Sequence, residues 1–275
     1  MGAYGSRLAP IFIFKRTLNV LVTISLYNRV KEVIFDLNKN HIRERELTEI
    51  ITLDGPAASG KSTLASMIAD KVNGFYINTG DMYRTLTWVI SEKNLDLEKD
   101  RQQIINLLQE LYIHYEKCDE HHMQLICDGN PVEQAKIRNP EVTKQVSAIA
   151  AIPEVRDWMV KCQRKCADVG LVVMEGRDIG TVVFPDAHYK FFVTASPEVR
   201  AKRRLAQDGE VPEGATVEKV AADIARRDEL DMNRAIAPLK QADDADFIDT
   251  SDLTVEQAVD KIVSIVSTKN NGIHA

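Results

Sequence analysis

The sequence predicts an α/β fold in three layers, with a five-stranded parallel sheet between two layers of helices. Five short apolar runs alternate with helix-compatible stretches, which is typical of repeated strand–helix–strand units with strands buried on both faces. A glycine-rich loop follows the first run and leads into a helical stretch. The five expected strands cover residues 50–54, 75–78, 171–174, 190–194 and 246–249.

The loop after the first strand reads G-P-A-A-S-G-K-S-T and matches the phosphate-binding pattern G-x-x-x-x-G-K-[ST]. Its backbone N–H groups and the N-terminus of the next helix are suited to surround triphosphate oxygens. Lys61 is expected to reach the β- and γ-phosphates, and Ser62 to ligate Mg²⁺. A chance glycine–serine turn is disfavoured because strand, spacing, lysine and hydroxyl agree. The sequence thus predicts a P-loop NTPase core whose ATP site comprises Gly55, Pro56, Ala57, Ala58, Ser59, Gly60, Lys61, Ser62 and Thr63.

Capping residues indicate where several helices begin and end. The first helix is expected over 61–72, because an Asn-Gly pair follows it. Ser196 precedes Pro and Glu, which is the pattern of a helix N-terminus, and that helix is expected to stop near Gly209. Thr254 and Gln257 have the spacing of a capping box and open the last helix.

Between the second and third strands lies an insertion too long for a simple crossover. It contains two alternating runs, 113–116 and 123–127, separated by a polar turn, which predicts a hairpin. A helix should start near Pro140 and break at Pro153. We therefore expect an inserted subdomain at about 86–157. An arginine-rich segment at about 200–234 is expected to act as a lid, with a hinge over 207–216.

Bulk composition limits the class of protein. The chain has 275 residues, 44% hydrophobic and 28% charged, which suits one large domain with insertions. A net charge of −6 disfavours a general nucleic-acid surface, and no apolar run reaches the length of a membrane span. The four cysteines lack a metal-ligand spacing and are expected to be reduced thiols. We expect a cytoplasmic monomer with small-molecule substrates and no nucleic-acid or membrane partner.

The N-terminal segment differs from the rest. Residues 1–48 carry eight Lys and Arg against four acidic residues. Three interpretations remain: an organelle-targeting peptide, an export signal, or a gene start placed too far upstream. An over-extended start or an accessory tail is favoured, because export of an ATP-using enzyme makes little biochemical sense. The expected organisation is an extension at 1–47 followed by the P-loop domain at 48–275.

Arginines follow two of the predicted strands. The second strand leads into N-T-G-D-M-Y-R and the third into E-G-R-D-I-G-T, which places Arg84 and Arg177 at the sheet edge where open α/β folds bind ligands. A guanidinium group suits bidentate contacts to phosphate. Helical spacing puts Arg227, Asp231 and Arg234 on one face of a later helix. Taken singly, a solvated charge or an ion pair is the simpler interpretation of Arg227 and Arg234.

At these motifs the chain resembles the nucleoside monophosphate kinases, and within them the bacterial-type cytidylate kinases. The most specific matches are E-G-R-D-I-G-T-V-V-F-P over 175–185 and R-D-E-L-D-M-N-R-A-I-A-P-L over 227–239. The resemblance covers about 48–267, including an insertion similar to the family's extended CMP-binding region. It implies ATP- and Mg²⁺-dependent phosphorylation of CMP and dCMP. A kinase of another nucleoside monophosphate, such as UMP or AMP, is the nearest alternative.

The resemblance also implies which residues bind the acceptor nucleotide. Arg84, Arg177 and Arg234 would hold its phosphate and form the catalytic set with Lys61; Ser147, Arg156 and Asp178 would read cytosine; Arg227 and Asp231 would lie near the ribose; and Thr79 stands where the family often has Ser. Two alternatives stay open: Ser147 as a buried helix hydroxyl bonding a carbonyl, and Arg156 as a plain surface residue.

A phosphate acceptor needs no general base, because its second pKa is about 6 and it is largely ionised at neutral pH. The sequence agrees, since it has no D-F-G motif or protein-kinase catalytic loop. A switch or motor ATPase would call for N-K-x-D or a clear Walker B motif. The first is absent and M-E-G-R matches the second poorly. The number of strand-end arginines also disfavours a pure nucleotide-binding module.

Overall fold

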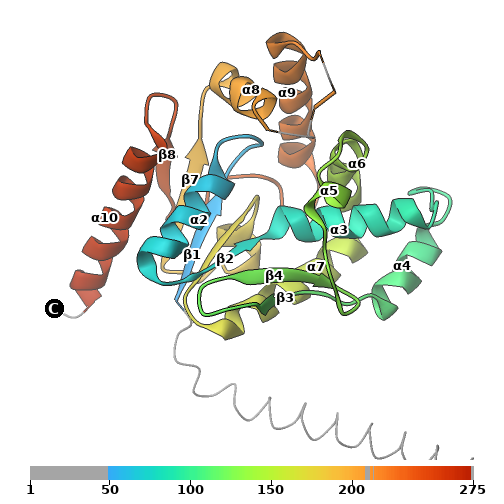
Figure 1. The fold of residues 1–275 in the computed structure, drawn as a ribbon, viewed down its shortest axis with the longest axis horizontal. Coiled ribbons are helices and arrows are strands. Elements are labelled where there is room, and N and C mark those ends of the chain that lie inside the picture. The colour runs from blue at the N-terminus through green and yellow to red at the C-terminus, as the bar shows by residue number, and fades with distance from the viewer. Residues whose placement is uncertain (1–48, 208–210, 213, 274–275) are drawn as a thin grey trace, which may run out of the picture. The chain divides into compact units, whose positions relative to one another are not determined.

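A parallel sheet of five strands organises the described part of the chain, and its strand order is β2-β6-β1-β7-β8 (Figure 1). Every neighbouring pair is parallel, so the predicted α/β fold with five parallel strands is confirmed. The strands are β1 (Ile50–Asp54), β2 (Phe75–Asn78), β6 (Val172–Gly176), β7 (Tyr189–Thr194) and β8 (Asp246–Asp249).

The computed structural model describes residues 49–273 except for 208–210 and 213. The predicted extension at 1–47 lies outside these residues, and so do residues 208–210 and 213 of the predicted hinge at 207–216. Residues 48–275 form one compact unit. In the part that is described, no helix is long and apolar enough to cross a membrane.

The two faces of the sheet bury different sets of side chains. Helices α2 (Lys61–Val72) and α10 (Val255–Ile273) pack on one face, against a cluster that includes Ile51, Leu53 and Val173. The other face packs Val172 and Met174 against α3 (Thr79–Glu92) and the inserted helices. The alternation of neighbouring residues between the two clusters is that of strands buried on both faces, and it gives the three predicted layers.

The insertion follows α3 and builds a second sheet, four α-helices and a 3-10 turn. The predicted hairpin is present, and the predicted break at Pro153 separates two helices. A third, two-residue strand that the sequence did not reveal extends the hairpin. The elements are α4 (Arg101–Glu110), β3 (Ile113–Lys117), β4 (Met123–Cys127), β5 (Asn130–Pro131), α5 (Gln134–Ile137), α6 (Pro140–Ala150), α7 (Pro153–Lys165) and the 3-10 turn η1 (Cys166–Val169).

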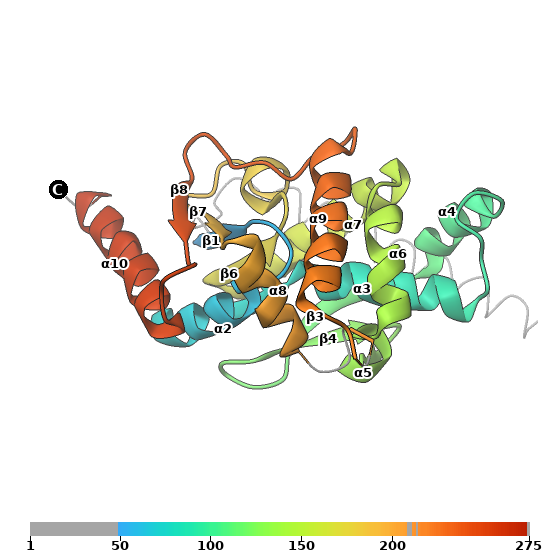
Figure 2. The same ribbon diagram turned by 90° about the horizontal axis from the view of Figure 1, so that it is seen from above.

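The arginine-rich segment forms two packed helices, α8 (Pro197–Leu205) and α9 (Val217–Asn233). Seen from above, α9 lies between α8 and α6 (Figure 2). Two expectations need correction. Helix α8 ends at Leu205 rather than near Gly209. Arg234, expected on the same helix face as Arg227 and Asp231, lies just after the last residue of α9, and its backbone is extended. The capping box at α10 is confirmed, because Thr254 and Gln257 exchange hydrogen bonds.

Candidate active site

The loop at residues 55–63 leaves β1 through a turn that requires glycine. Gly55 has a φ of +149°, and a Cβ there would collide with the carbonyl oxygen of Val193 on the neighbouring strand. The loop then leads directly into α2. The backbone amides at the start of this helix lack partners within it, and they carry the positive end of the helix dipole. The strand, turn and helix therefore form an anion site in the arrangement that the sequence predicts.

Lys61 lies inside this loop, with 4% of its surface exposed. Its Nζ donates to the carbonyl oxygen of Pro56 at 2.6 Å and to Oγ of Ser59 at 3.2 Å. Burial, with the nearby guanidinium of Arg177 adding to the shift and nearby carboxylates opposing it, lowers the pKa of Lys61 to about 7. An anionic ligand beside Nζ would therefore favour the charged amine strongly.

The two arginine-rich helices, α8 and α9, also contact the loop. Ala57 donates its backbone N–H to Asp228 at 2.9 Å, and Arg200 pairs with that carboxylate while donating to the Ala57 carbonyl oxygen at 3.1 Å. Arg203 donates to the carbonyl oxygen of Ser59 at 3.0 Å. These contacts connect α8 and α9 to the loop, so the segment predicted as a lid lies on the predicted ATP site.

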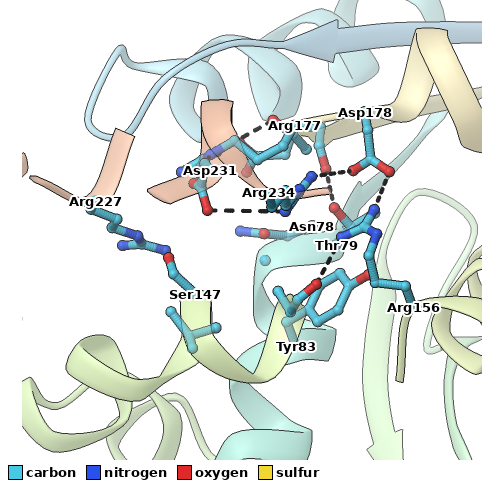
Figure 3. Close-up of a pocket in the computed structure, with 15 residues that line it drawn as sticks. Asn78, Thr79, Tyr83, Ser147, Arg156, Arg177, Asp178, Arg227, Asp231 and Arg234 are labelled. Carbon is cyan, nitrogen blue, oxygen red and sulfur yellow. Dashed lines mark hydrogen bonds and ion pairs between the residues drawn. The ribbon is translucent and has the colours of Figure 1, made fainter. Parts of the chain in front are cut away.

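A pocket lies at the carboxyl ends of β2 and β6 (Figure 3). Asp178 accepts hydrogen bonds from Arg156 and from Nη2 of Arg234, the latter at 3.3 Å. Nε of Arg177 donates to Asp231 at 3.0 Å. Side chains from the strand ends and from α3, α6, α7 and α9 thus converge on one cavity.

The pocket is rich in buried charge. Four arginines line it, Arg156, Arg177, Arg227 and Arg234, against three carboxylates. Burial lowers the pKa of Arg227 to about 9, with Arg84 and Arg177 adding to the shift. Burial alone would raise the pKa of Asp231, but its arginine neighbours outweigh this and hold the value below the usual range. An excess of desolvated guanidinium groups favours an anionic ligand.

Several donors in this pocket have no partner. Nε of Arg156, Nε of Arg227 and the hydroxyl of Tyr83 are all buried, and none makes a hydrogen bond within the described residues. Buried polar groups are nearly always paired in folded proteins. Unpaired donors in one cavity therefore point to a polar ligand that completes them.

Most residues predicted to bind the acceptor come together in this pocket. They are Thr79, Ser147, Arg156, Arg177, Asp178, Arg227, Asp231 and Arg234. The open alternative for Arg156 is wrong, because only 2% of its surface is exposed.

Arg84 does not line the pocket. It is buried, and its Nη1 donates to Oγ1 of Thr143 at 2.7 Å. Its predicted contact with phosphate therefore stays a prediction.

The comparisons with known proteins agree with this geometry. The family model described as cytidylate kinase matches residues 51–268. The chain belongs to the cytidylate kinase family. A cytidylate kinase of Bacillus cereus is 43% identical over 217 residues, covering 79% of this chain and 95% of the relative. One from Geobacillus is 46% identical over 80% of this chain and 96% of its own length, and one from Clostridium botulinum is 44% identical over 78% and 96%.

Family membership confirms the predicted resemblance and makes the chain a phosphotransferase with a phosphate group as acceptor. Such an enzyme needs two anion sites next to each other. The P-loop and the arginine pocket meet this need, because β1 and β6 are adjacent strands and both sites lie at their carboxyl ends.

Sequence reasoning missed several polar residues of the site. Asn78, Tyr83 and Glu175 line the pocket, and all three stand inside motifs that the sequence displays. Arg138 pairs with the buried Asp81 at 2.7 Å, close to the second strand end. It follows the short helix α5 and belongs to no strand-end motif, so no signal in the sequence pointed to it.

The side chains around the loop are suited to a metal ion that arrives already bound to the nucleotide. No group of three or more His, Cys, Asp or Glu side chains able to hold a metal occurs in the described ranges. Mg²⁺ usually keeps several waters and binds through one or two protein groups plus substrate phosphates. The partly exposed hydroxyl of Ser62, in the first turn of α2, meets that requirement.

Proposed function

We propose that this chain transfers the γ-phosphoryl group of ATP to CMP and dCMP, giving CDP or dCDP and ADP. The observation that carries the proposal is the proximity of the two anion sites. Asp54, which precedes the P-loop, pairs in the sheet with Gly176, which precedes Arg177 of the acceptor pocket. The kinship with enzymes named cytidylate kinase supports CMP as the acceptor, and no observation favours UMP or AMP.

Phosphoryl transfer mainly requires the protein to position two anions that repel each other. Lys61 and the P-loop amides hold the donor phosphates, and Ser62 would hold the Mg²⁺ that would neutralise charge on them. Arg177 and Arg234 take the acceptor phosphate, and we keep Arg84 as a third predicted phosphate ligand. Because the acceptor phosphate is already ionised at neutral pH, no side chain needs to remove a proton.

Recognition of the base rests on Asp178 with Arg156 and Ser147. The carboxylate accepts from the amino group of cytosine, and the guanidinium donates to the ring acceptors. Uracil presents a carbonyl where cytosine has its amine, so a carboxylate would face an acceptor at a cost of about 1–3 kcal/mol. Arg227 and Asp231 lie beside Ser147 in the same pocket, which supports their predicted place near the ribose.

We propose a monomer with small-molecule substrates, working in the cytoplasm where ATP and CMP are available. Light scattering of the purified protein tests the monomer directly. A stable dimer at micromolar concentration would contradict it.

The decisive experiment measures ADP release from ATP with and without CMP. The proposal predicts release only when CMP or dCMP is present, and a loss of release in Lys61→Ala with an unchanged circular dichroism spectrum. Lys71→Ala is the matched control, because Lys71 lies on the same helix but is exposed and pairs with Asp260. ADP release without any acceptor, or a fully active Lys61→Ala, would contradict the proposal.

A further inference from the structure

Asp54 is the last residue of β1 and immediately precedes the P-loop. Only 5% of its surface is exposed. In the sheet it stands between Gly176 of β6 and Phe192 of β7. A buried carboxylate is costly unless it is well hydrogen-bonded, so its partners indicate what it does.

Both carboxylate oxygens bond to backbone amides of a different segment. Oδ1 accepts from the N–H of Ile179 at 2.8 Å and Oδ2 from the N–H of Gly180 at 2.7 Å. Burial raises the pKa of Asp54 to about 6, and these two amides oppose the rise. Because both oxygens accept from N–H groups, this arrangement favours the ionised carboxylate.

The two amides open η2 (Ile179–Val183), a single helical turn of π type. The first amides of any helical turn have no partner within it. Here the turn closes through the amides of Val182 and Val183, which donate to the carbonyl oxygen of Asp178. Asp54 supplies the missing acceptors from the neighbouring strand, in the role that a capping residue normally plays from the same segment.

The turn also lies directly against β1. A Cβ added to Gly180 would stand 2.9 Å from Oγ1 of Thr52 and 3.2 Å from Cδ of Lys190. No room is left for the turn to shift towards the strand. The carboxylate bonds and this close packing together fix the backbone that begins at Ile179.

We propose that Asp54 is a positioning residue for the acceptor nucleotide, holding the turn at Ile179 and Gly180 so that Arg177 and Asp178 point into the pocket. The inference rests on the proposed function. Asp54 is next to the ATP loop in the chain but bonds to the acceptor side in space. Its loss therefore impairs the use of CMP and spares the use of ATP.

Asp54→Asn tests this, because the amide has one accepting oxygen and turns its NH₂ group towards the second N–H. The KM for CMP should rise about ten-fold or more, while the KM for ATP stays within about two-fold. Hydrogen exchange of the peptide that spans 177–183 should be faster than in the wild type. Ile262→Ala is the control: it removes buried volume from α10, far along the chain, and should lower the thermal midpoint with both KM values unchanged.

A second variant guards against failure of Asp54→Asn to fold. Gly180→Ala keeps the carboxylate but presses a methyl group onto Thr52, so it should displace the turn and give the same split between the two KM values. The inference is overturned if the variants that fold leave the KM for CMP unchanged, or raise the KM of both substrates alike. If the wild type used a different monophosphate, the proposed function would fail, yet the same split measured with that acceptor would still decide the role of Asp54.

Discussion

Arg177 links the two halves of the site electrostatically. Its Nε donates to Asp231 in the acceptor pocket, and its charge lowers the pKa of Lys61 in the P-loop. A kinase brings two polyanions close together. Cations that are already near each other before either substrate arrives assist this, because substrate binding then relieves the repulsion between the cations.

The lowered pKa of Lys61 leads to a prediction about pH. With a value of about 7, the amine of the free enzyme loses its proton well below the usual range for lysine. Phosphate oxygens favour the charged amine, so binding of ATP at about pH 8 should take up a proton. Calorimetry in buffers of different ionisation enthalpy measures this uptake. Lys61→Arg should abolish it, because arginine stays charged. Absence of uptake in the wild type would contradict the account.

Asp178→Asn should weaken the discrimination between cytosine and uracil. The amide can still accept from cytosine, but its NH₂ group can also donate to the carbonyl of uracil. We expect the ratio of kcat/KM for CMP over UMP to fall about ten-fold or more. Asp223→Asn is a control on α9, because Asp223 is exposed and pairs with the exposed Arg226. An unchanged ratio in Asp178→Asn would remove this residue from base recognition.

Single residues also show how far sequence reasoning reaches. The position of Arg177 and Asp178 after a strand predicts that they lie at the ligand-binding edge of the sheet, because strand ends of a parallel sheet share an edge. Both residues line the pocket there. The same rule placed Arg84 there, yet its guanidinium turns to Thr143 of the insertion. Arg138 and Asp54 depend on tertiary partners, Asp81 and the η2 amides. No local pattern encodes such partners.

At the scale of elements, apolar runs predicted all five strands of the main sheet, because buried parallel strands are continuous in hydrophobicity. Strand β6 extends two residues beyond its predicted end, since Glu175 and Gly176 pair with Leu53 and Asp54 of β1. Polar strand ends carry no hydrophobic signal, and in this fold the polar end is where the site lies. The helix caps, by contrast, were readable because their hydrogen bonds are local.

The turn between β1 and α2 gives a prediction for stability. Gly55→Ala should cost more than about 3 kcal/mol in the free energy of unfolding, because it combines a disfavoured φ with a clash against the backbone of β7. Gly129→Ala is the matched control: its φ is also positive, at +76°, but no atom lies within 4 Å. It should cost only about 1–2 kcal/mol. Denaturant unfolding measures both, and equal costs would refute the packing argument.

For the whole molecule, the family match and the compact unit both leave out the N-terminal segment. We propose that the kinase activity does not need residues 1–47. A chain of residues 48–275 should therefore keep kcat/KM for CMP and ATP within about two-fold of the full chain. A large fall in activity or in thermal midpoint would show that the segment takes part in the enzyme.

The central claim is that two anion sites face each other at one sheet edge, a P-loop for ATP and a guanidinium pocket for CMP. A crystal structure of the enzyme with CMP and a non-hydrolysable ATP analogue tests it most directly. The account predicts that Arg177 and Arg234 exchange part of their pairing with Asp231 and Asp178 for hydrogen bonds to the CMP phosphate. A complex in which CMP is bound and both guanidinium groups remain on their carboxylates, away from that phosphate, would contradict it.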